Sequence, residues 1–208
     1  IHGPSVPHIL GLGQSQVKMD SQAEGAEVMR PVTATHNLSV MSIGFLLENR
    51  DSAVIWRGPM KYHVIKQFLK DVNWGDLDYL VVDSPPGTGD EPLSVGQMLG
   101  TPSHALIVTT PQELSISDVR KCITFCRQLG ISPLGVIENM SGFICPHCGQ
   151  RTNIFNTGGG KSMAEQMDVE FLGDVPLDPH VVESGDGGTP YLNRFADTPT
   201  AKAFAEIA

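Results

Sequence analysis

One group of residues with the types and spacing for chemistry surrounds Asp83. An apolar, β-branched run at residues 79–82 ends in this carboxylate, and the chain then breaks into a proline- and glycine-rich turn. This pattern is typical of a buried parallel strand that brings a charge to the carboxyl edge of an α/β sheet, where ligands bind. In a nucleotide hydrolase such a carboxylate lies beside Mg²⁺, and a nearby glycine lets backbone N–H groups approach a phosphate. We interpret Asp83 and Gly87 as catalytic; the alternative is an aspartate that caps the next helix.

The second group is Cys145 and Cys148, a Cys-x-x-Cys pair in a turn. Two thiolates at this spacing point toward one metal, as in zinc ribbons and iron–sulfur sites. A tetrahedral site needs four ligands, and the remaining cysteines, Cys122 and Cys126, fall on a predicted helix as small buried residues. A two-fold dimer that shares the pairs of both subunits would complete the set. Zinc and a redox dithiol are the alternatives, although a redox motif is expected at the start of a helix.

The composition restricts the class of protein. The chain has 208 residues, 40% of them hydrophobic and 18% charged, which suits one soluble globular domain over residues 1–208. Its formal net charge of -9, without a basic run, argues against nucleic acid as a partner. No apolar stretch reaches the length of a membrane span and no signal peptide opens the chain, so we expect a cytoplasmic protein without a membrane partner.

Apolar runs alternate with helical patterns along the chain, which predicts a three-layer α/β fold. The sheet is expected to be mostly parallel, with helices on both faces. A short helix near residues 6–10, capped by Ser5, precedes an irregular stretch at 14–37. The predicted strands are residues 38–43, 53–56, 79–83, 105–110, 134–139 and 171–176. The predicted helices are residues 60–72, 91–99, 115–129 and 161–167, with a short one after Pro179 and a metal loop at about 143–152.

The string GGGKS at residues 158–162 superficially matches a phosphate-binding loop. The full pattern would need glycine at position 155, where the chain has Phe155, and no buried strand directly precedes it. We therefore interpret these glycines as the start of a helix at 161–167 whose first N–H groups are left accessible.

Six short motifs make the chain resemble the Mrp/Nbp-type iron–sulfur cluster carrier ATPases, in the MinD/ParA branch of P-loop proteins. The motifs run in collinear order over nearly the whole chain: GPSVP (3–7), WRGP (56–59), DSPPGTGD (83–90), TPQ (110–112), ENMSGF (138–143) and CPHC (145–148). The family's phosphate loop, a Lys-Gly-Gly-x-Gly-Lys-Ser/Thr run, is absent. The resemblance implies a P-loop NTPase-like fold that is N-terminally truncated, with the first strand and phosphate loop upstream of Ile1.

For the metal site, the resemblance implies a labile 4Fe-4S cluster that bridges two subunits through Cys145 and Cys148. The cluster would be passed to recipient iron–sulfur apoproteins. The carrier would work as a homodimer or as a hetero-oligomer with a paralogue.

For the nucleotide site, the resemblance implies ATP with Mg²⁺. Gly3 and Ser5 would form a switch near the γ-phosphate, and Asn139 would recognise the base. Pro176 and Asp178 would wall the base pocket. A local turn for Asn139 and a helix cap for Asp178 are the alternatives from the residues alone.

The leading functional hypothesis is an ATP-dependent carrier in which hydrolysis gates cluster transfer. Without the lysine-bearing loop, we expect this chain alone to bind ATP poorly or not at all. A MinD/ParA-like positioning ATPase, which acts by dimerising on a surface, is one alternative. It would need a basic patch or a terminal amphipathic anchor, and neither is visible in the sequence. A non-catalytic metal-binding interaction domain is the other.

Overall fold

The structure is a computed structural model that describes residues 5–21, 27–47, 49 and 58–208. Its backbone contacts divide the chain into two compact units. The first comprises Ile1–Met98 and Ser184–Pro190, and the second comprises Leu99–Glu183 and Tyr191–Ala208. The single domain expected from the sequence stays a prediction, and each unit is described by itself.

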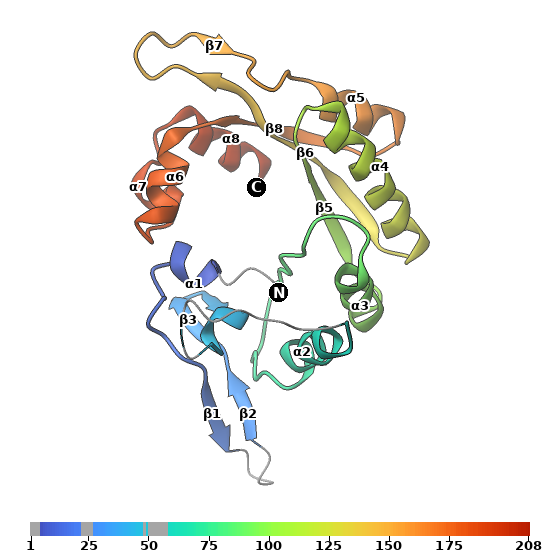
Figure 1. The fold of residues 1–208 in the computed structure, drawn as a ribbon, viewed down its shortest axis with the longest axis vertical. Coiled ribbons are helices and arrows are strands. Elements are labelled where there is room, and N and C mark those ends of the chain that lie inside the picture. Colours follow the sequence, from blue (N-terminus) through green and yellow to red (C-terminus); the bar gives the residue numbers. More distant parts are fainter. Residues whose placement is uncertain (1–4, 22–26, 48, 50–57) are drawn as a thin grey trace. The chain divides into compact units, whose positions relative to one another are not determined.

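The second unit contains an α/β sheet with β6 at its centre (Figure 1). β6 pairs in parallel with β5 on one side and with β8 on the other, while the short β7 pairs antiparallel with the end of β6. The strands are β5 (His104–Thr109), β6 (Ser132–Ile144), β7 (Arg151–Thr152) and β8 (Phe171–Leu177). Three predicted strands and the α/β class are thus confirmed.

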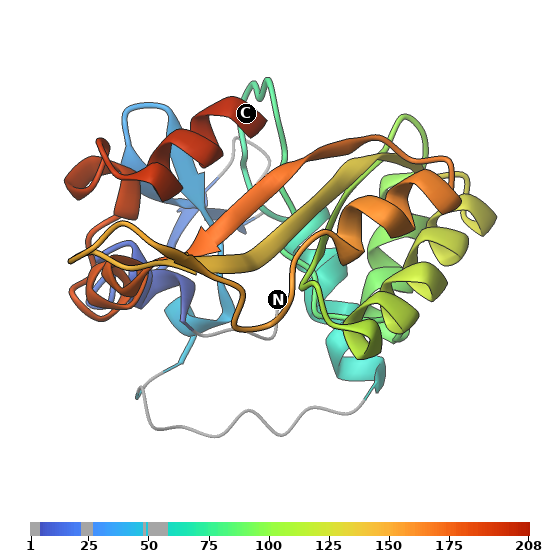
Figure 2. The same cartoon turned by 90° about the horizontal axis from the view of Figure 1, so that it is seen from above.

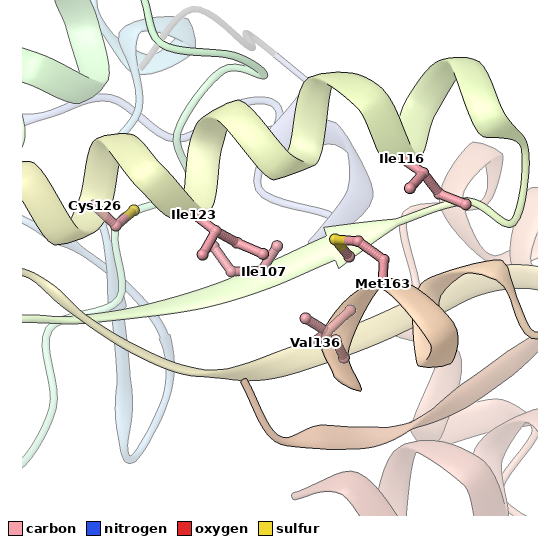
Figure 3. Packing of buried hydrophobic residues seen from close by; sticks show 7 residues of the cluster. Ile107, Ile116, Ile123, Cys126, Val136 and Met163 are labelled. Carbon is pink, nitrogen blue, oxygen red and sulfur yellow. The ribbon is translucent and has the colours of Figure 1, made fainter. Parts of the chain in front are cut away.

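Two helices, α4 (Glu113–Gln128) and α5 (Gly159–Gln166), pack on one face of this sheet (Figure 2). Residues 116, 123 and 126 recur at helical spacing, so α4 presents one apolar face to the strands (Figure 3). The buried cluster comprises Ile107, Ile116, Ile123, Cys126, Val136, Met163 and Ala164. Cys126 is therefore a core residue, as expected.

The opposite face of the sheet is covered unevenly. α8 (Pro199–Ile207) packs on β8, where Gly173 lies against Ile207. On β5, the side chains of Leu106 and Val108 are exposed, although those of Ile107 and Thr109, which alternate with them, are buried. Helices thus cover both faces of the sheet at β8, as expected. At β5, one face of the sheet is covered and the other is exposed to solvent.

β6 extends five residues beyond the predicted strand at 134–139. Met140 and Gly142 have positive φ angles, 57° and 74°, and the pairing register with β8 shifts between Asn139 and Phe143. Such an irregularity bends a strand and changes its direction without ending it. The second half of β6 consequently leads away from the sheet edge into a hairpin with β7.

The described part of the first unit contains two antiparallel hairpins and two longer helices with buried faces. Residues 14–37 were predicted to be irregular, which is wrong for the part described, because β1 pairs with β2 and β3 with β4. The helix predicted at 60–72 is present as α2, in which Val64, Ile65 and Phe68 are buried. The elements are α1 (Val6–Ile9), β1 (Lys18–Ser21), β2 (Glu27–Arg30), β3 (Val32–Thr35), β4 (Leu38–Val40), the 3₁₀ helix η1 (Ile43–Phe45), α2 (Gly58–Lys70) and α3 (Asp90–Leu99).

The predicted strand at residues 79–83 is wrong. This segment is not part of a sheet, and the side chains of Tyr79 and Val81 are 87% and 88% exposed. A strand needs neighbours that satisfy its backbone N–H and C=O groups, and none of the described strands pairs with this segment. The predicted strand at 53–56 lies outside the described residues. None of the described helices combines the length and the apolar character needed to cross a membrane.

Candidate metal-binding loop and nucleotide-site residues

Cys145 and Cys148 lie in the tight loop that joins β6 to β7. The loop is closed by two backbone hydrogen bonds: the N–H of Cys145 donates to the carbonyl of Gln150 at 3.0 Å, and that of Gly149 donates to the carbonyl of Cys145 at 2.9 Å. Gly149 has φ +70°, a conformation that glycine adopts without the cost of a side chain. Cys145 is half-buried, Cys148 is exposed, and neither is in a disulfide.

The loop favours the thiolate of Cys145. The backbone N–H groups of Cys148 and His147 donate hydrogen bonds to its sulfur, and the Cys148 side chain adds a third interaction. Together they hold the pKa of Cys145 below its usual range despite some burial. Because the thiolate is the form that binds metal, the loop is prepared to act as a ligand.

Two sulfurs make half of a tetrahedral ligand set. In the part of the chain that the structure describes, no group of three or more His, Cys, Asp or Glu side chains converges on one point. His147 lies within the Cys-x-x-Cys turn but contributes its backbone N–H to the Cys145 sulfur. Among the described residues, the loop therefore offers two cysteine sulfurs, which are half of a tetrahedral ligand set.

Before it reaches this loop, β6 carries a buried carboxylate for which the sequence analysis gave no role. Glu138 is 0% exposed. Its Oε1 accepts hydrogen bonds from the Ser141 hydroxyl at 2.6 Å and from the Gly158 N–H at 2.8 Å, and its Oε2 accepts one from the Gly160 N–H at 2.6 Å. Burial of a carboxylate is costly unless it is fully hydrogen-bonded, and these donors satisfy it.

The glycines at 158–160 therefore bind an internal carboxylate. The predicted helix at 161–167 is present, but α5 begins earlier, at Gly159. The N–H groups of Gly158 and Gly160 donate to Glu138, whereas the prediction left them accessible. A Cβ at Gly160 would lie 2.9 Å from Thr109 Cγ2 and 3.0 Å from Glu138 Oε2, so only glycine allows this approach. The signal in the sequence was an acid within an apolar strand, together with a glycine-rich helix start able to receive it.

Two of the predicted base-site residues lie side by side. Asn139 on β6 is opposite Val175 on β8, directly before the buried Pro176. The Asn139 Oδ1 accepts the N–H of Met140 at 2.9 Å, which is the local turn named above as the alternative. This bond helps Met140 to hold its positive φ angle.

Asp178 caps α6 (Pro179–Asp186). Its Oδ1 accepts the N–H of His180 at 2.9 Å and lies 2.7 Å from His180 Nδ1, and its Oδ2 accepts the Tyr191 hydroxyl at 2.6 Å. Burial opposes ionisation, but these hydrogen bonds outweigh it and lower the pKa of Asp178. Burial, and then the bond to Asp178, raise the pKa of Tyr191. The geometry is that of the helix cap given as the alternative.

Asp83 and Gly87 lie in the first unit, between the exposed segment at 79–82 and the start of α3. Gly87 has φ +90° with open space around its Cα, so the backbone there is exposed. α3 begins at Asp90 as predicted. It is tied to α2 by an ion pair between Lys61 and Glu91 at 2.7 Å.

Of the two predicted switch residues, Gly3 lies outside the described residues. Ser5 precedes α1, but its side chain makes no capping hydrogen bond, contrary to the prediction. Its φ and ψ angles, −79° and −24°, are helical, whereas a capping serine needs an extended conformation.

The fold places the chain among the P-loop NTPases. A solved structure of the nucleotide-binding protein of Archaeoglobus fulgidus, in complex with ADP and with cobalt found by PIXE, is similar with a TM-score of 0.73 and 37% identity. The similarity covers 96% of this chain and 77% of that one. The cell division ATPase MinD of Pyrococcus furiosus shares the fold, with a TM-score of 0.53 over 74% of this chain and 60% of that one, at 24% identity.

A family model then identifies the group. The model described as ParA, NUBPL iron-transfer P-loop NTPase, matches residues 1–208, and the chain belongs to this family. Among curated relatives, a cytosolic Fe-S cluster assembly factor Nubp2 homolog of Anopheles gambiae is 50% identical over 99% of this chain and 79% of its own length. The cytosolic Fe-S cluster assembly factor NUBP2 of Rattus norvegicus is 49% identical over 99% and 76%. The resemblance drawn from the sequence is thus confirmed.

Proposed function

We propose that this protein is a cytosolic iron–sulfur cluster assembly factor that holds a 4Fe-4S cluster at Cys145 and Cys148 and transfers it to recipient apoproteins. The observation that carries the proposal is the β6–β7 loop, where backbone N–H groups stabilise the Cys145 thiolate beside an exposed second thiol. The curated relatives, named as cytosolic Fe-S cluster assembly factors, support the same role.

The exposure of the loop fits a cargo better than a structural metal. A structural zinc site is closed by four ligands from one chain, whereas the loop presents two thiols near the surface. A redox dithiol of the thioredoxin type belongs at a helix N-terminus, and this pair lies at the end of a hairpin. An exposed, two-ligand site can deliver a cluster to another protein because the acceptor's ligands can reach it.

A second subunit would supply the other two thiolates. We propose that two chains, identical or paralogous, meet at the β6–β7 loops so that two Cys145/Cys148 pairs hold one cluster. An isologous contact of this kind places the same loop from both subunits on the symmetry axis. The long β6, which projects its second half beyond the β5 pairing, supports such a meeting.

The phosphates of the nucleotide would bind through residues of the first unit. We propose that Asp83 lies beside Mg²⁺, that the backbone at Gly87, with Gly3 and Ser5, senses the γ-phosphate, and that these residues support ATP hydrolysis together with a lysine-bearing phosphate loop. Catalysis at such a site is a matter of position and charge more than of covalent chemistry. Membership of the iron-transfer P-loop NTPase family supports this assignment.

The base would bind near the ends of β6 and β8. We propose that Asn139 contacts the adenine through its amide nitrogen while its Oδ1 keeps the bond to Met140. Pro176, which follows the Val175 that pairs with Asn139, would form an apolar wall. Asp178 would contribute indirectly, because its carboxylate is occupied by His180 and Tyr191.

Anaerobic reconstitution with iron and sulfide tests the central part of the proposal. The wild-type chain should gain visible absorption and shift to a dimer, and Cys145→Ala and Cys148→Ala should each lose both. Cys122→Ala is the matched control, since Cys122 lies on α4 outside the loop, and it should retain both signals. Survival of absorption and dimerisation in the two loop variants would overturn the proposal.

A further inference from the structure

The hairpin that carries the cysteines has few backbone attachments. β7 consists of two residues, and it pairs with β6 only at Phe143 with Thr152 and at Ile144 with Arg151. Two-stranded ladders are marginally stable even when they are longer than this. Side-chain contacts must therefore fix the direction in which the loop projects.

The side chain of Arg151 makes these contacts. Its Nη2 donates to the carbonyl of Ser141 on β6 at 2.7 Å and to the Asp174 carboxylate on β8 at 2.7 Å. The guanidinium thus ties β7 to both β6 and β8. The side chains of Arg151 and Asp174 are 46% and 40% exposed, so the ion pair contributes modestly to stability, but its planar geometry defines a direction.

The backbone beneath the guanidinium is shaped to receive it. Gly142 has φ +74°, and a Cβ there would lie 2.7 Å from Arg151 Nε and 3.1 Å from the side-chain oxygen of Asn153. A larger residue would push the arginine out of its place. Glycine at this position allows the arginine to cross the irregular part of β6 and reach Ser141.

The carbonyl that Arg151 binds belongs to a firmly held residue. Ser141 is fully buried, and its hydroxyl donates to Glu138 at 2.6 Å and lies 3.0 Å from that of Thr157. Glu138 in turn accepts N–H groups from the start of α5. A continuous set of hydrogen bonds therefore runs from α5 through β6 to the arginine at the base of the loop.

We propose that Arg151 is the positioning residue for the metal-binding loop, and that it acts by anchoring the loop to Ser141 and Asp174. The inference rests on the proposed function of Cys145 and Cys148. With the anchor in place, the loop holds the two cysteine sulfurs in position before metal binds. Without it, the loop must be ordered during binding, which weakens affinity without removing a ligand.

Cobalt(II) titration of the reduced, anaerobic chain, followed by sulfur-to-cobalt charge-transfer absorption and chelator competition, tests this inference. Arg151→Met should weaken cobalt binding about fivefold, equivalent to about 1 kcal/mol, and should speed metal loss to the chelator. Asp174→Asn should weaken binding about twofold, and adding it to Arg151→Met should have no further effect if the two act as a unit.

Arg127→Met is the matched control. Arg127 is also exposed and also donates to backbone carbonyls, at Met167 and Asp168, at the end of α4 away from the hairpin elements. The substitution Arg127→Met should leave the affinity for cobalt unchanged. The inference is overturned if Arg151→Met and Asp174→Asn bind cobalt as the wild type does. Charge-transfer absorption that persists in Cys145→Ala and Cys148→Ala would instead refute the proposed metal site.

Discussion

Two segments with similar sequence patterns differ in burial and in strand pairing. Residues 79–83 and residues 134–139 are both apolar runs that end in a polar side chain. In the second, Val136 is 0% exposed and pairs with Ile107 on one side and with Phe171 on the other. In the first, Val81 is 88% exposed and belongs to no strand. An apolar pattern thus shows which segments can be buried in a sheet, and neighbouring strands decide whether they are.

The strongest test of this comparison places the same charge in both segments. Val136→Asp should destabilise the protein by about 4 kcal/mol or prevent folding, because an unpaired carboxylate would be buried. Val81→Asp should change the free energy of unfolding by less than about 0.5 kcal/mol, since water already surrounds the side chain. Urea unfolding measures both, and equal effects would show that residues 79–83 are buried in solution.

Substitutions of Glu138, also on β6, should have the next largest effect on the free energy of unfolding. Glu138→Ala should destabilise the protein by about 3 kcal/mol, because the N–H groups of Gly158 and Gly160 and the Ser141 hydroxyl lose their acceptor. Glu138→Gln, which keeps one acceptor oxygen, should cost about half as much. Urea unfolding again measures the change, and a neutral Glu138→Ala would mean that the buried network does not hold β6 to α5.

Gly160 allows a sharper test of the same contact. Gly160→Ala should cost about 2 kcal/mol, because its Cβ would meet Thr109 and the Glu138 carboxylate at or below 3.0 Å. Gly185, inside α6, has open space and no positive φ angle, so Gly185→Ala should be neutral or stabilising by about 0.5 kcal/mol. The midpoint temperatures of thermal unfolding of the two variants, compared with that of the wild type, test this prediction. Similar shifts in the two variants would contradict the close approach of α5 to β6.

A smaller, pH-dependent effect is expected at Asp178. Because its folded-state pKa is lowered, the carboxylate stabilises the protein above the ordinary aspartate pKa, and this contribution is lost as the pH falls through the lowered value. Asp178→Asn should therefore reduce the free energy of unfolding at neutral pH. The variant should also lose less stability than the wild type as the pH falls. Unfolding midpoints measured from pH 7 down to pH 3 test this. An unchanged acid dependence in Asp178→Asn would contradict the stabilising role of the cap.

Much of the second unit could be predicted from the sequence, because its strands and helices have clear periodicity. The strand at 105–110 and the helices at 115–129 and 161–167 all appear close to their expected places. The conformation of residues 79–83 could not be predicted, because the local pattern does not show whether neighbouring strands are available to pair with this segment. The predicted strand at 38–43 is present in part as β4, but β1, β2 and β3, within residues 14–37, were missed because these strands are short and have little apolar pattern.

The contacts around the candidate site were harder to predict than the ligands. The spacing of Cys145 and Cys148 is a local signal that a turn converts directly into geometry. Arg151 and Asp174 are 23 residues apart, and their contact depends on the pairing of β6 with β7 and β8. Glu138 lies within the predicted strand at 134–139, and nothing in the local pattern shows that it is the acceptor for the start of α5.

The most direct test of the account is the iron and acid-labile sulfide content of the reconstituted chain, measured together with its mass in solution. A 4Fe-4S cluster shared between two Cys145/Cys148 loops predicts about two iron and two sulfide per chain in a dimer. Four iron and four sulfide per monomeric chain, or metal bound without sulfide, would contradict it.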